Sequence, residues 1–288
     1  MIYIAITTVP DRLMSANIIL ESLSSLLNQK TSETYKVVIS IPYKYKCYEE
    51  EIIIPKHLTD MENKYNGQLI ILRSDIDYGP ITNLLCPLKL LDMNSEDIII
   101  VCDDDHIYSA DMLDYHIYKL KQYPNNRAIC FRGNQPIELR VWKQGDIQMG
   151  KFYDTHVYFP TNRDIYLKFP DHWHSVSYRR GLLGSDIFDK DFLDITWNND
   201  HLMAYYAATH NFYFLCAVYD QETDHRVVND VGRGSSSFPI DSTIPIDNPS
   251  GCNLLRERFP ELKNDVWDNI KFRSVFISKK ETKLQWDK

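Results

Sequence analysis

Three consecutive aspartates stand at the end of an apolar stretch in the segment EDIIIVCDDDHIY, residues 96–108. Neighbouring carboxylates repel one another, so a run of three calls for a positive charge close by. A hard divalent cation such as Mg²⁺ or Mn²⁺ takes oxygen ligands and would remove that repulsion. If the strand continues through the run, Asp103 and Asp105 point to one side and Asp104 to the other. The alternative is a solvated acidic turn that caps the following helix.

The composition is that of an ordinary globular protein and does not suggest a nucleic-acid partner. Hydrophobic residues make up 44% and charged residues 25% of the 288 residues, which is enough for a sizeable core. The net charge is −8, whereas a nucleic-acid-binding domain usually carries a basic face. The 6 cysteines form no Cys-x-x-Cys pair, and no apolar run approaches the roughly 20 residues that span a bilayer. We therefore expect a cytoplasmic protein without a signal peptide or membrane span.

The elements that must position the aspartates alternate between strands and helices in the first half of the chain. Strands are expected at 2–7, 35–41, 68–72, 97–102 and 128–131, and helices at 13–29, 82–91 and 112–122. Strands that are apolar on both faces and separated by helices indicate a parallel sheet covered on each side. Ligands of such sheets bind beyond the carboxyl ends of the strands, where the polar loops TTVPDR, RSDIDYGP and DDDHIY are expected.

The second half of the chain is less regular. Short β-like pieces (LRVW, HVYF and IYLKF) are mixed with Gly, Pro, His and Trp, and a helix at 199–208 precedes the strand-like NFYFLCAV. The stretch after His225 is rich in Gly, Ser, Pro and Asp and is typical of a flexible loop. We see no repeat and no clear linker. We therefore expect one α/β domain over residues 1–240, with halves at 1–130 and 131–240, and a C-terminal extension, 241–288, that packs on it.

The order of these segments resembles that of the GT-A-fold glycosyltransferases, which have a hydrophobic strand that ends in an Asp-x-Asp motif. The matching pieces, all within residues 1–130, are IAITTVPDRL, the helix that ends in LLNQ, VVISIP, DIDYGPITNLL and IIIVCDDDHIYS. The resemblance implies a Rossmann-type, mostly parallel sheet flanked by helices. It also implies a nucleoside-diphosphate sugar as donor, usually a UDP-sugar, and a divalent metal, Mn²⁺ or Mg²⁺, that holds the donor diphosphate.

The resemblance also assigns roles on the donor side. Asp105 would be the main metal ligand, Asp103 a metal ligand or a ribose contact, and His225 a further ligand. Asn83 stands where relatives often carry a lysine, which is a departure from the family pattern. The nucleotide pocket would be lined by Thr7, Thr8, Val9, Pro10, Arg12, Asp75, Asp77, Tyr78, Gly79, Asn83, Asp103 and Asp104.

Transfer to an acceptor hydroxyl also requires a base, because a hydroxyl is a poor nucleophile until it loses its proton. Asp200 opens the helix at 199–208, where the helix dipole stabilises a carboxylate. The resemblance implies that an acid at this place is the base of inverting enzymes; the structural alternative is a plain N-cap. Asp186, in YRRGLLGSDIF, is the alternative base. Contacts to the acceptor or donor sugar are expected from Gly184, Ser185, Trp173 and Trp197.

We therefore predict a hexosyl- or pentosyltransferase of glycan biosynthesis that moves a sugar from a UDP-sugar to a glycan hydroxyl with inversion. Two other functions fit parts of the sequence. A haloacid-dehalogenase-like phosphatase also has an apolar strand followed by Asp-x-Asp, but in an early strand and with a Thr or Val shortly after it. Here His106 and Ile107 follow the motif. A non-catalytic protein of the same fold would bind nucleotides or sugars without turnover.

Overall fold

The computed structural model of the chain describes residues 1–46, 48, 50–131, 133–134, 164–167, 169–170, 172, 175–190, 193, 203–217 and 227–230. The chain divides into two compact units, one of Met1–Gln135 with His156–Ile246 and one of Pro136–Thr155 with Asp247–Lys288. All described residues belong to the first unit. The expected boundary between residues 240 and 241 therefore stays a prediction.

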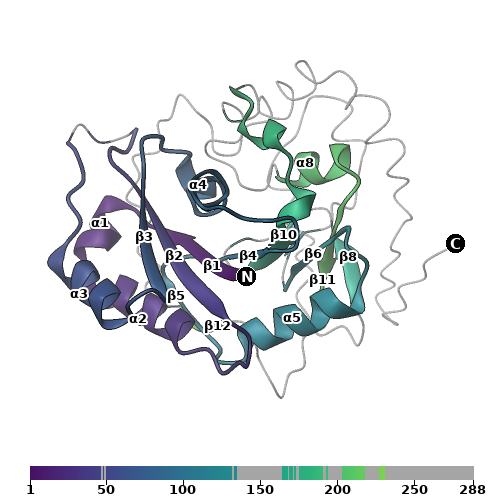
Figure 1. Ribbon diagram of the computed structural model, residues 1–288, viewed down its shortest axis with the longest axis horizontal. Helices are drawn as coiled ribbons and strands as arrows, with labels where there is room; N and C mark the ends of the chain where they lie inside the picture. Colours follow the sequence, from purple (N-terminus) through teal and green to yellow (C-terminus); the bar gives the residue numbers. More distant parts are fainter. Residues whose placement is uncertain are drawn as a thin grey trace, which may run out of the picture. The chain divides into compact units, whose positions relative to one another are not determined.

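A mixed sheet forms the centre of the first unit (Figure 1). Within the described residues it has eight strands, in the order β3-β2-β1-β4-β10-β6-β11-β8. Strands β10 and β8 run antiparallel to their neighbours, and the other strands are parallel to one another. The strands are β1 (Ile2–Thr7), β2 (Tyr35–Pro42), β3 (Leu69–Ser74), β4 (Ile98–Val101), β6 (Arg127–Cys130), β8 (Ile165–Leu167), β10 (Val176–Arg179) and β11 (Tyr213–Cys216). The mostly parallel α/β sheet predicted from the sequence is confirmed.

Helices cover both faces of the sheet, which explains why its central strands are apolar on both sides. Helix α4 lies on one face, and the other described helices of the first half lie on the opposite face (Figure 1). Ile4, Ile39 and Ile100, from three neighbouring strands, are fully buried in the core under α2. The helices are α1 (Pro10–Met14), α2 (Ala16–Leu27), α3 (Lys56–Lys64), α4 (Thr82–Leu90), α5 (Met112–Gln122) and α8 (Met203–Thr209).

Short elements complete the described part of the chain. Three 3₁₀ turns are η1 (Gly79–Ile81), η4 (Arg180–Leu182) and η5 (Ser185–Phe188). Strand β5 (His106–Tyr108) pairs with β12 (Val227–Asp230), and β7 (Gly133–Asn134) pairs with β9 (Phe169–Pro170). Four cysteines, Cys86, Cys102, Cys130 and Cys216, are free and buried, as expected for small apolar side chains. None of the helices in this part of the chain has the length and apolar character needed to cross a membrane.

The structure corrects two of the expected elements and adds a strand that was not expected. The helix expected at 13–29 is two helices, because the extended backbone of Ser15 (φ −84, ψ 94) ends α1 before α2 begins. The stretch after His225 is not all loop, since Val227–Asp230 pairs with β5. Strand β10 was not expected at all: it alternates polar and apolar residues and is inserted between two strands that run the other way.

Candidate functional site

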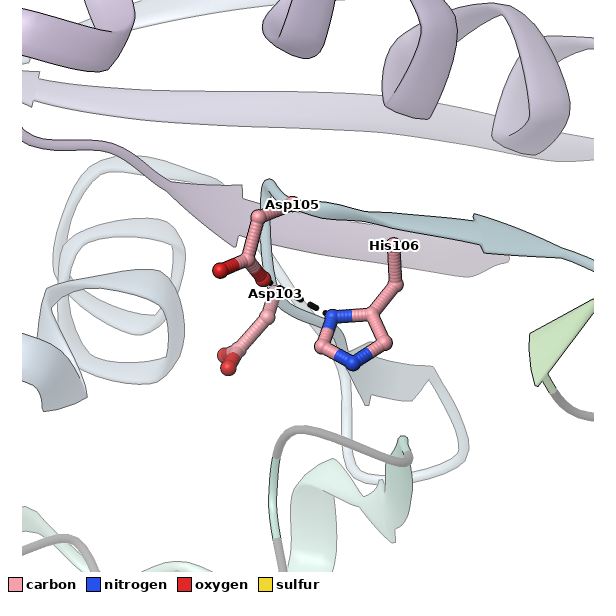
Figure 2. Close-up of side chains that lie close together, drawn as sticks. All are labelled: Asp103, Asp105 and His106. Atoms are coloured by element: carbon pink, nitrogen blue, oxygen red, sulfur yellow. Dashed lines mark hydrogen bonds and ion pairs between the residues drawn. The ribbon is translucent and has the colours of Figure 1, made fainter. Parts of the chain in front are cut away.

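The three aspartates lie in the turn after β4, not in the strand itself. Strand β4 ends at Val101, Asp104 and Asp105 form a turn, and β5 begins at His106. Potential ligand atoms of Asp103, Asp105 and His106 all lie within 4.8 Å of one another (Figure 2). The side chain of Asp104 is engaged elsewhere. The side chain of Asp104 is separated from the other two carboxylates by this turn and not by the alternation of a strand. None of the three aspartates caps α5, because the N-cap of that helix is Asp111.

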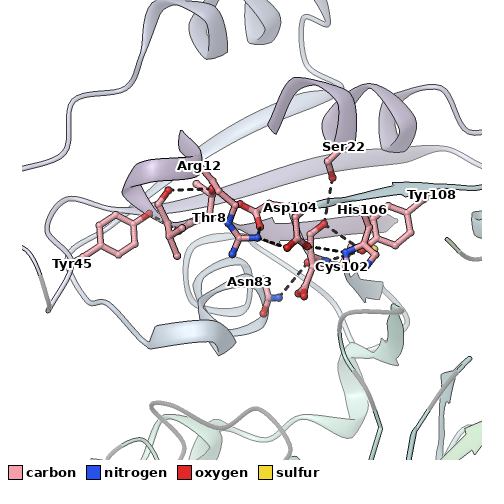
Figure 3. A network of polar contacts seen from close by, with 12 residues as sticks. Thr8, Arg12, Ser22, Tyr45, Asn83, Cys102, Asp104, His106 and Tyr108 are labelled. Carbon is pink, nitrogen blue, oxygen red and sulfur yellow. Dashed lines mark hydrogen bonds and ion pairs between the residues drawn. The ribbon is translucent and has the colours of Figure 1, made fainter. Parts of the chain in front are cut away.

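Asp104 is the buried member of the trio, with 3% of its surface exposed. Its carboxylate forms an ion pair with Arg12 Nη1 at 2.8 Å and accepts a short hydrogen bond from the hydroxyl of Thr8 (Figure 3). Burial raises the pKa of Asp104 to about 6, and the charge of Arg12 and the hydroxyl of Thr8 limit the rise. Tyr45 in turn donates to the carbonyl of Thr8 at 2.7 Å. This network fixes the loop after β1 against the acidic turn.

Asp105 is the charged member of the trio, and both Arg12 and His106 contact its carboxylate. Its Oδ2 lies 2.6 Å from Arg12 Nη1, and its Oδ1 lies 2.8 Å from Nδ1 of His106. Burial alone would raise the pKa of Asp105, but the hydrogen bond from His106 and the charge of Arg12 bring it below its usual value. Because a carboxylate only accepts, Nδ1 of His106 carries a proton, and a neutral ring then has its lone pair on Nε2.

The other expected residues of the first loop shape the backbone beside this network. The hydroxyl of Thr7 donates to the carbonyl of Ser40 at 2.8 Å, which ties the ends of β1 and β2 together. Val9 is the N-cap of α1 and Pro10 its first residue, and both are buried. The sequence placed Thr8 and Arg12 in the nucleotide pocket; the structure shows them bound to Asp104.

The second expected loop, residues 75–79, is a tight turn built around Asp77. The buried carboxylate of Asp77 accepts hydrogen bonds from the backbone N–H of Lys46 at 2.9 Å and of Gly79 at 2.8 Å. Gly79 has φ +67, a conformation that favours glycine. Tyr78 is buried, whereas Asp75 is exposed. Within this turn, the carboxylate of Asp75 is therefore accessible to a bound molecule, whereas that of Asp77 is buried and hydrogen-bonded to the backbone.

Asn83 lies between this loop and the acidic turn. It is buried on α4, and its Nδ2 approaches the carbonyl of Cys102 at 3.4 Å, one residue before Asp103 (Figure 3). A neutral amide therefore stands at the place where the resemblance to glycosyltransferases led us to look for a lysine. It contacts the backbone of the acidic turn, and no positive charge is added to the site at this point.

A second cluster forms around Asp186, in the turn that the sequence placed on the acceptor side. Asp186 Oδ1 accepts from the hydroxyl of Tyr206 at 2.9 Å, and Oδ2 lies 2.8 Å from Nε2 of His210. The backbone N–H of Gly184 donates to the Tyr206 hydroxyl at 2.8 Å. Burial and the bond to Asp186 raise the pKa of the Tyr206 phenol. Ser185 is exposed at the start of η5.

The histidine of this cluster has polar partners on both sides. Nδ1 of His210 lies 2.9 Å from the carbonyl of Tyr206 and 3.0 Å from the hydroxyl of Thr209, and Nε2 faces Asp186. The His210 ring stacks on the Tyr206 ring with centroids 3.8 Å apart. Phe188 meets Tyr78 edge to face at 6.4 Å, so this turn adjoins the loop at 75–79.

Several site residues were missed or cannot be placed. His106, Tyr206 and His210 had no role assigned from the sequence; the available signals were the position of His106 directly after Asp105 and the i, i+4 spacing of Tyr206 and His210. In the pairing of β12 with β5, Asp230 stands opposite His106. The predicted residues Asp200, His225, Trp173 and Trp197 lie outside the described residues, so their roles stay predictions.

Comparison with known proteins gives no match by sequence: no family model and no curated protein matches the chain. Solved structures do match its fold. The mannosyltransferase PcManGT of Pyrobaculum calidifontis, solved with GDP-Man and Mn²⁺, matches at a TM-score of 0.50 with 14% identity over 81% of this chain. This chain spans 58% of that protein.

Two further structures match at lower scores. GalNAc-T7, solved with UDP, GalNAc and Mn²⁺, has a TM-score of 0.45 and 9% identity over 76% of this chain and 44% of its own. The cytidylyltransferase IspD of Francisella tularensis has a TM-score of 0.38 and 12% identity over 73% of this chain and 87% of its own. The assignment therefore rests on the mannosyltransferase, and at that identity the likeness concerns the fold. The chain has the GT-A-like fold of the glycosyltransferases that its sequence resembles.

Proposed function

We propose that this chain is a metal-dependent glycosyltransferase that uses a nucleoside-diphosphate sugar, with a UDP-sugar as the expected donor. One observation carries the proposal: Asp103, Asp105 and His106 gather potential ligand atoms at the carboxyl end of β4. In an open α/β sheet this edge is where ligands bind. The mannosyltransferase of similar fold, solved with GDP-Man and Mn²⁺, supports the same class of donor and metal.

The residues present fit a divalent cation. Two carboxylates and one imidazole, with ligand atoms within 4.8 Å of one another, suit Mn²⁺, and the oxygen ligands suit Mg²⁺ as well. Asp105 is ready to act as an anion because its pKa is lowered. When bound, the cation would neutralise charge that develops on the leaving diphosphate. Asp103, Asp105 and His106 are the residues that would hold it.

Besides the proposed metal ligands, residues of two turns are proposed to contact the donor and the acceptor. On the donor side, the turn at 75–79 presents the exposed Asp75, and Asp77 holds that turn in shape. On the acceptor side, Tyr206 and His210 hold the carboxylate of Asp186 at a half-exposed position. A carboxylate fixed in this way suits a hydrogen bond from a sugar hydroxyl.

We assign the base to Asp200, three residues before Met203, the first residue of α8. An inverting reaction on a glycan hydroxyl follows from a base at this place, with Trp173, Trp197, Gly184 and Ser185 as the proposed sugar contacts. His225 is retained as a proposed further metal ligand. Asp186 remains the alternative base.

The experiment is a screen of UDP-, GDP- and dTDP-sugars for metal-dependent release of the nucleoside diphosphate. We expect release by the wild type with Mn²⁺ or Mg²⁺, and its loss in Asp105→Asn. Asp60→Asn is the matched control, because Asp60 lies on α3 in an exposed pair with Lys56. Undiminished release by Asp105→Asn would contradict the proposal. Hydrolysis of an aryl phosphate without use of any sugar donor would instead favour the phosphatase.

A further inference from the structure

The guanidinium of Arg12 bridges two of the three carboxylates in the acidic turn. A single nitrogen, Nη1, lies 2.8 Å from Asp104 Oδ1 (Figure 3). The same nitrogen lies 2.6 Å from Asp105 Oδ2. The side chain of Arg12 is 21% exposed, whereas that of Asp104 is 4% exposed. One end of this bridge is therefore buried, and the other end lies at the residue that the proposed function assigns to the metal.

We propose that Arg12 is the resident cation of the metal-free site and gives way at Asp105 when a divalent cation binds. The inference rests on the proposed function, because it concerns the same site. Arg12 offers one positive charge to two carboxylates, those of Asp104 and Asp105. A divalent cation that binds Asp105 would add the charge that a single guanidinium does not supply.

Arg12 and a metal cannot both hold Asp105 in the observed way. Oδ2 of Asp105 already contacts Nη1 of Arg12, and Oδ1 already accepts from His106. A metal–oxygen bond of about 2.0–2.6 Å would place a second cation beside the guanidinium, and the two positive charges would repel each other. Arg12 keeps an anionic partner when it leaves Asp105, since Asp104 remains bound to the same nitrogen.

The position of Arg12 allows such a change without rearrangement of the core. It lies on the short helix α1, which ends at Met14, and its side chain is partly exposed. Asp104 keeps the hydroxyl of Thr8 as a second partner throughout. Once it leaves Asp105, the guanidinium is a planar cation next to the metal, where the donor diphosphate is expected.

The test measures Mn²⁺ affinity directly, from the electron paramagnetic resonance signal of the free ion, in nucleotide-free protein. Removing the competing cation should make Arg12→Gln bind Mn²⁺ about tenfold more tightly than the wild type. Arg12→Lys keeps a positive charge at this place, so its gain in Mn²⁺ affinity should be smaller than that of Arg12→Gln. Lys56→Gln, which loses a charge from the exposed pair on α3, should leave the affinity unchanged.

A second measurement does not depend on the folding of Arg12→Gln. In wild-type protein labelled with ¹⁵N, the Nε–H resonance of Arg12, assigned by its absence from Arg12→Lys, should shift as Mg²⁺ is added. Equal or weaker Mn²⁺ binding by Arg12→Gln, or an unchanged Arg12 resonance at Mg²⁺ saturation, would overturn the exchange and leave the proposed function standing. If wild type and variants bind no metal, even with UDP or GDP, the proposed function fails as well.

Discussion

Two turns of this chain use the same chemistry in different surroundings. In the acidic turn, Asp104 is buried and held by Arg12 and Thr8, and Asp105 is held by Arg12 and His106. In the turn at 184–188, the side chain of Asp186 is 49% exposed and is held by Tyr206 and His210. Charges interact more strongly where water is excluded. The first turn therefore suits a metal and a diphosphate, and the second suits a neutral sugar hydroxyl.

The largest expected difference between the two turns is in stability, when the carboxylate of Asp104 or of Asp186 is removed. Asp104→Ala leaves the charge of Arg12 without its buried partner, and we expect a loss of about 3–5 kcal/mol in the free energy of unfolding. Asp186→Ala removes a half-exposed carboxylate, so the loss should stay below about 1 kcal/mol. Urea unfolding at pH 7 measures both. Equal losses would show that burial does not distinguish the two turns.

Two histidines offer the same comparison between a buried and a partly exposed position. In contrast to His210, His116 is fully buried between the hydroxyls of Ser175 and Ser177, each 2.9 Å from a ring nitrogen. Burial lowers the pKa of His116 to about 3. The unfolded chain, with a histidine pKa of about 6.5, takes up the proton first as the pH falls, so stability is lost below pH 6.5.

This linkage predicts a loss of about 3 kcal/mol by pH 4 from His116 alone. His116→Gln keeps a side chain that can both donate to and accept from the two serines but does not titrate. Urea unfolding between pH 7 and pH 4 should therefore show a steeper decline for the wild type than for the variant. An equal decline in the free energy of unfolding of the two proteins would mean that His116 becomes charged in the folded protein within this pH range.

A further small change in stability is expected from the tyrosine that supports Asp186. Tyr206→Phe removes the hydroxyl that links Gly184 to Asp186, at an expected loss of about 1 kcal/mol. Sugar transfer should fall, because Asp186 loses one of its two supports, while metal-dependent nucleotide binding stays the same. Tyr118→Phe, an exposed position on α5, is the control. A loss of nucleotide binding in Tyr206→Phe would place the second turn on the donor side.

The sequence was informative where burial dictates the residue pattern. Strand β1 was expected with its observed bounds, and β2 with bounds one residue short, because both of their faces are apolar. Helix α3 was missed because only Leu58 and Met61 are buried on it, too few for a periodic signal. Strand β12 was missed because its four residues stand beside a Gly- and Ser-rich stretch and are set by pairing with β5.

The site was predictable in its residue types but not in its pairings. The separation of Asp104 from Asp103 and Asp105 was expected from alternation, and the structure produces it through a turn. The ion pairs of Arg12 join residues more than 90 positions apart, and the bond between Tyr206 and Asp186 joins two distant segments. Such contacts depend on how the helices and strands pack together, and the local residue pattern does not encode that packing.

The proposed role of Asp103, Asp105 and His106 is to hold the cation through which a nucleoside diphosphate binds. It is tested most directly by thermal unfolding with UDP or GDP, in Mn²⁺ and in EDTA, of the wild type and of Asp103→Asn. The wild type should be stabilised by a nucleotide only in Mn²⁺, by about 2.7 kcal/mol at 100 times the Kd, and Asp103→Asn should not respond. Equal stabilisation in EDTA, or an undiminished response of Asp103→Asn, would contradict the account.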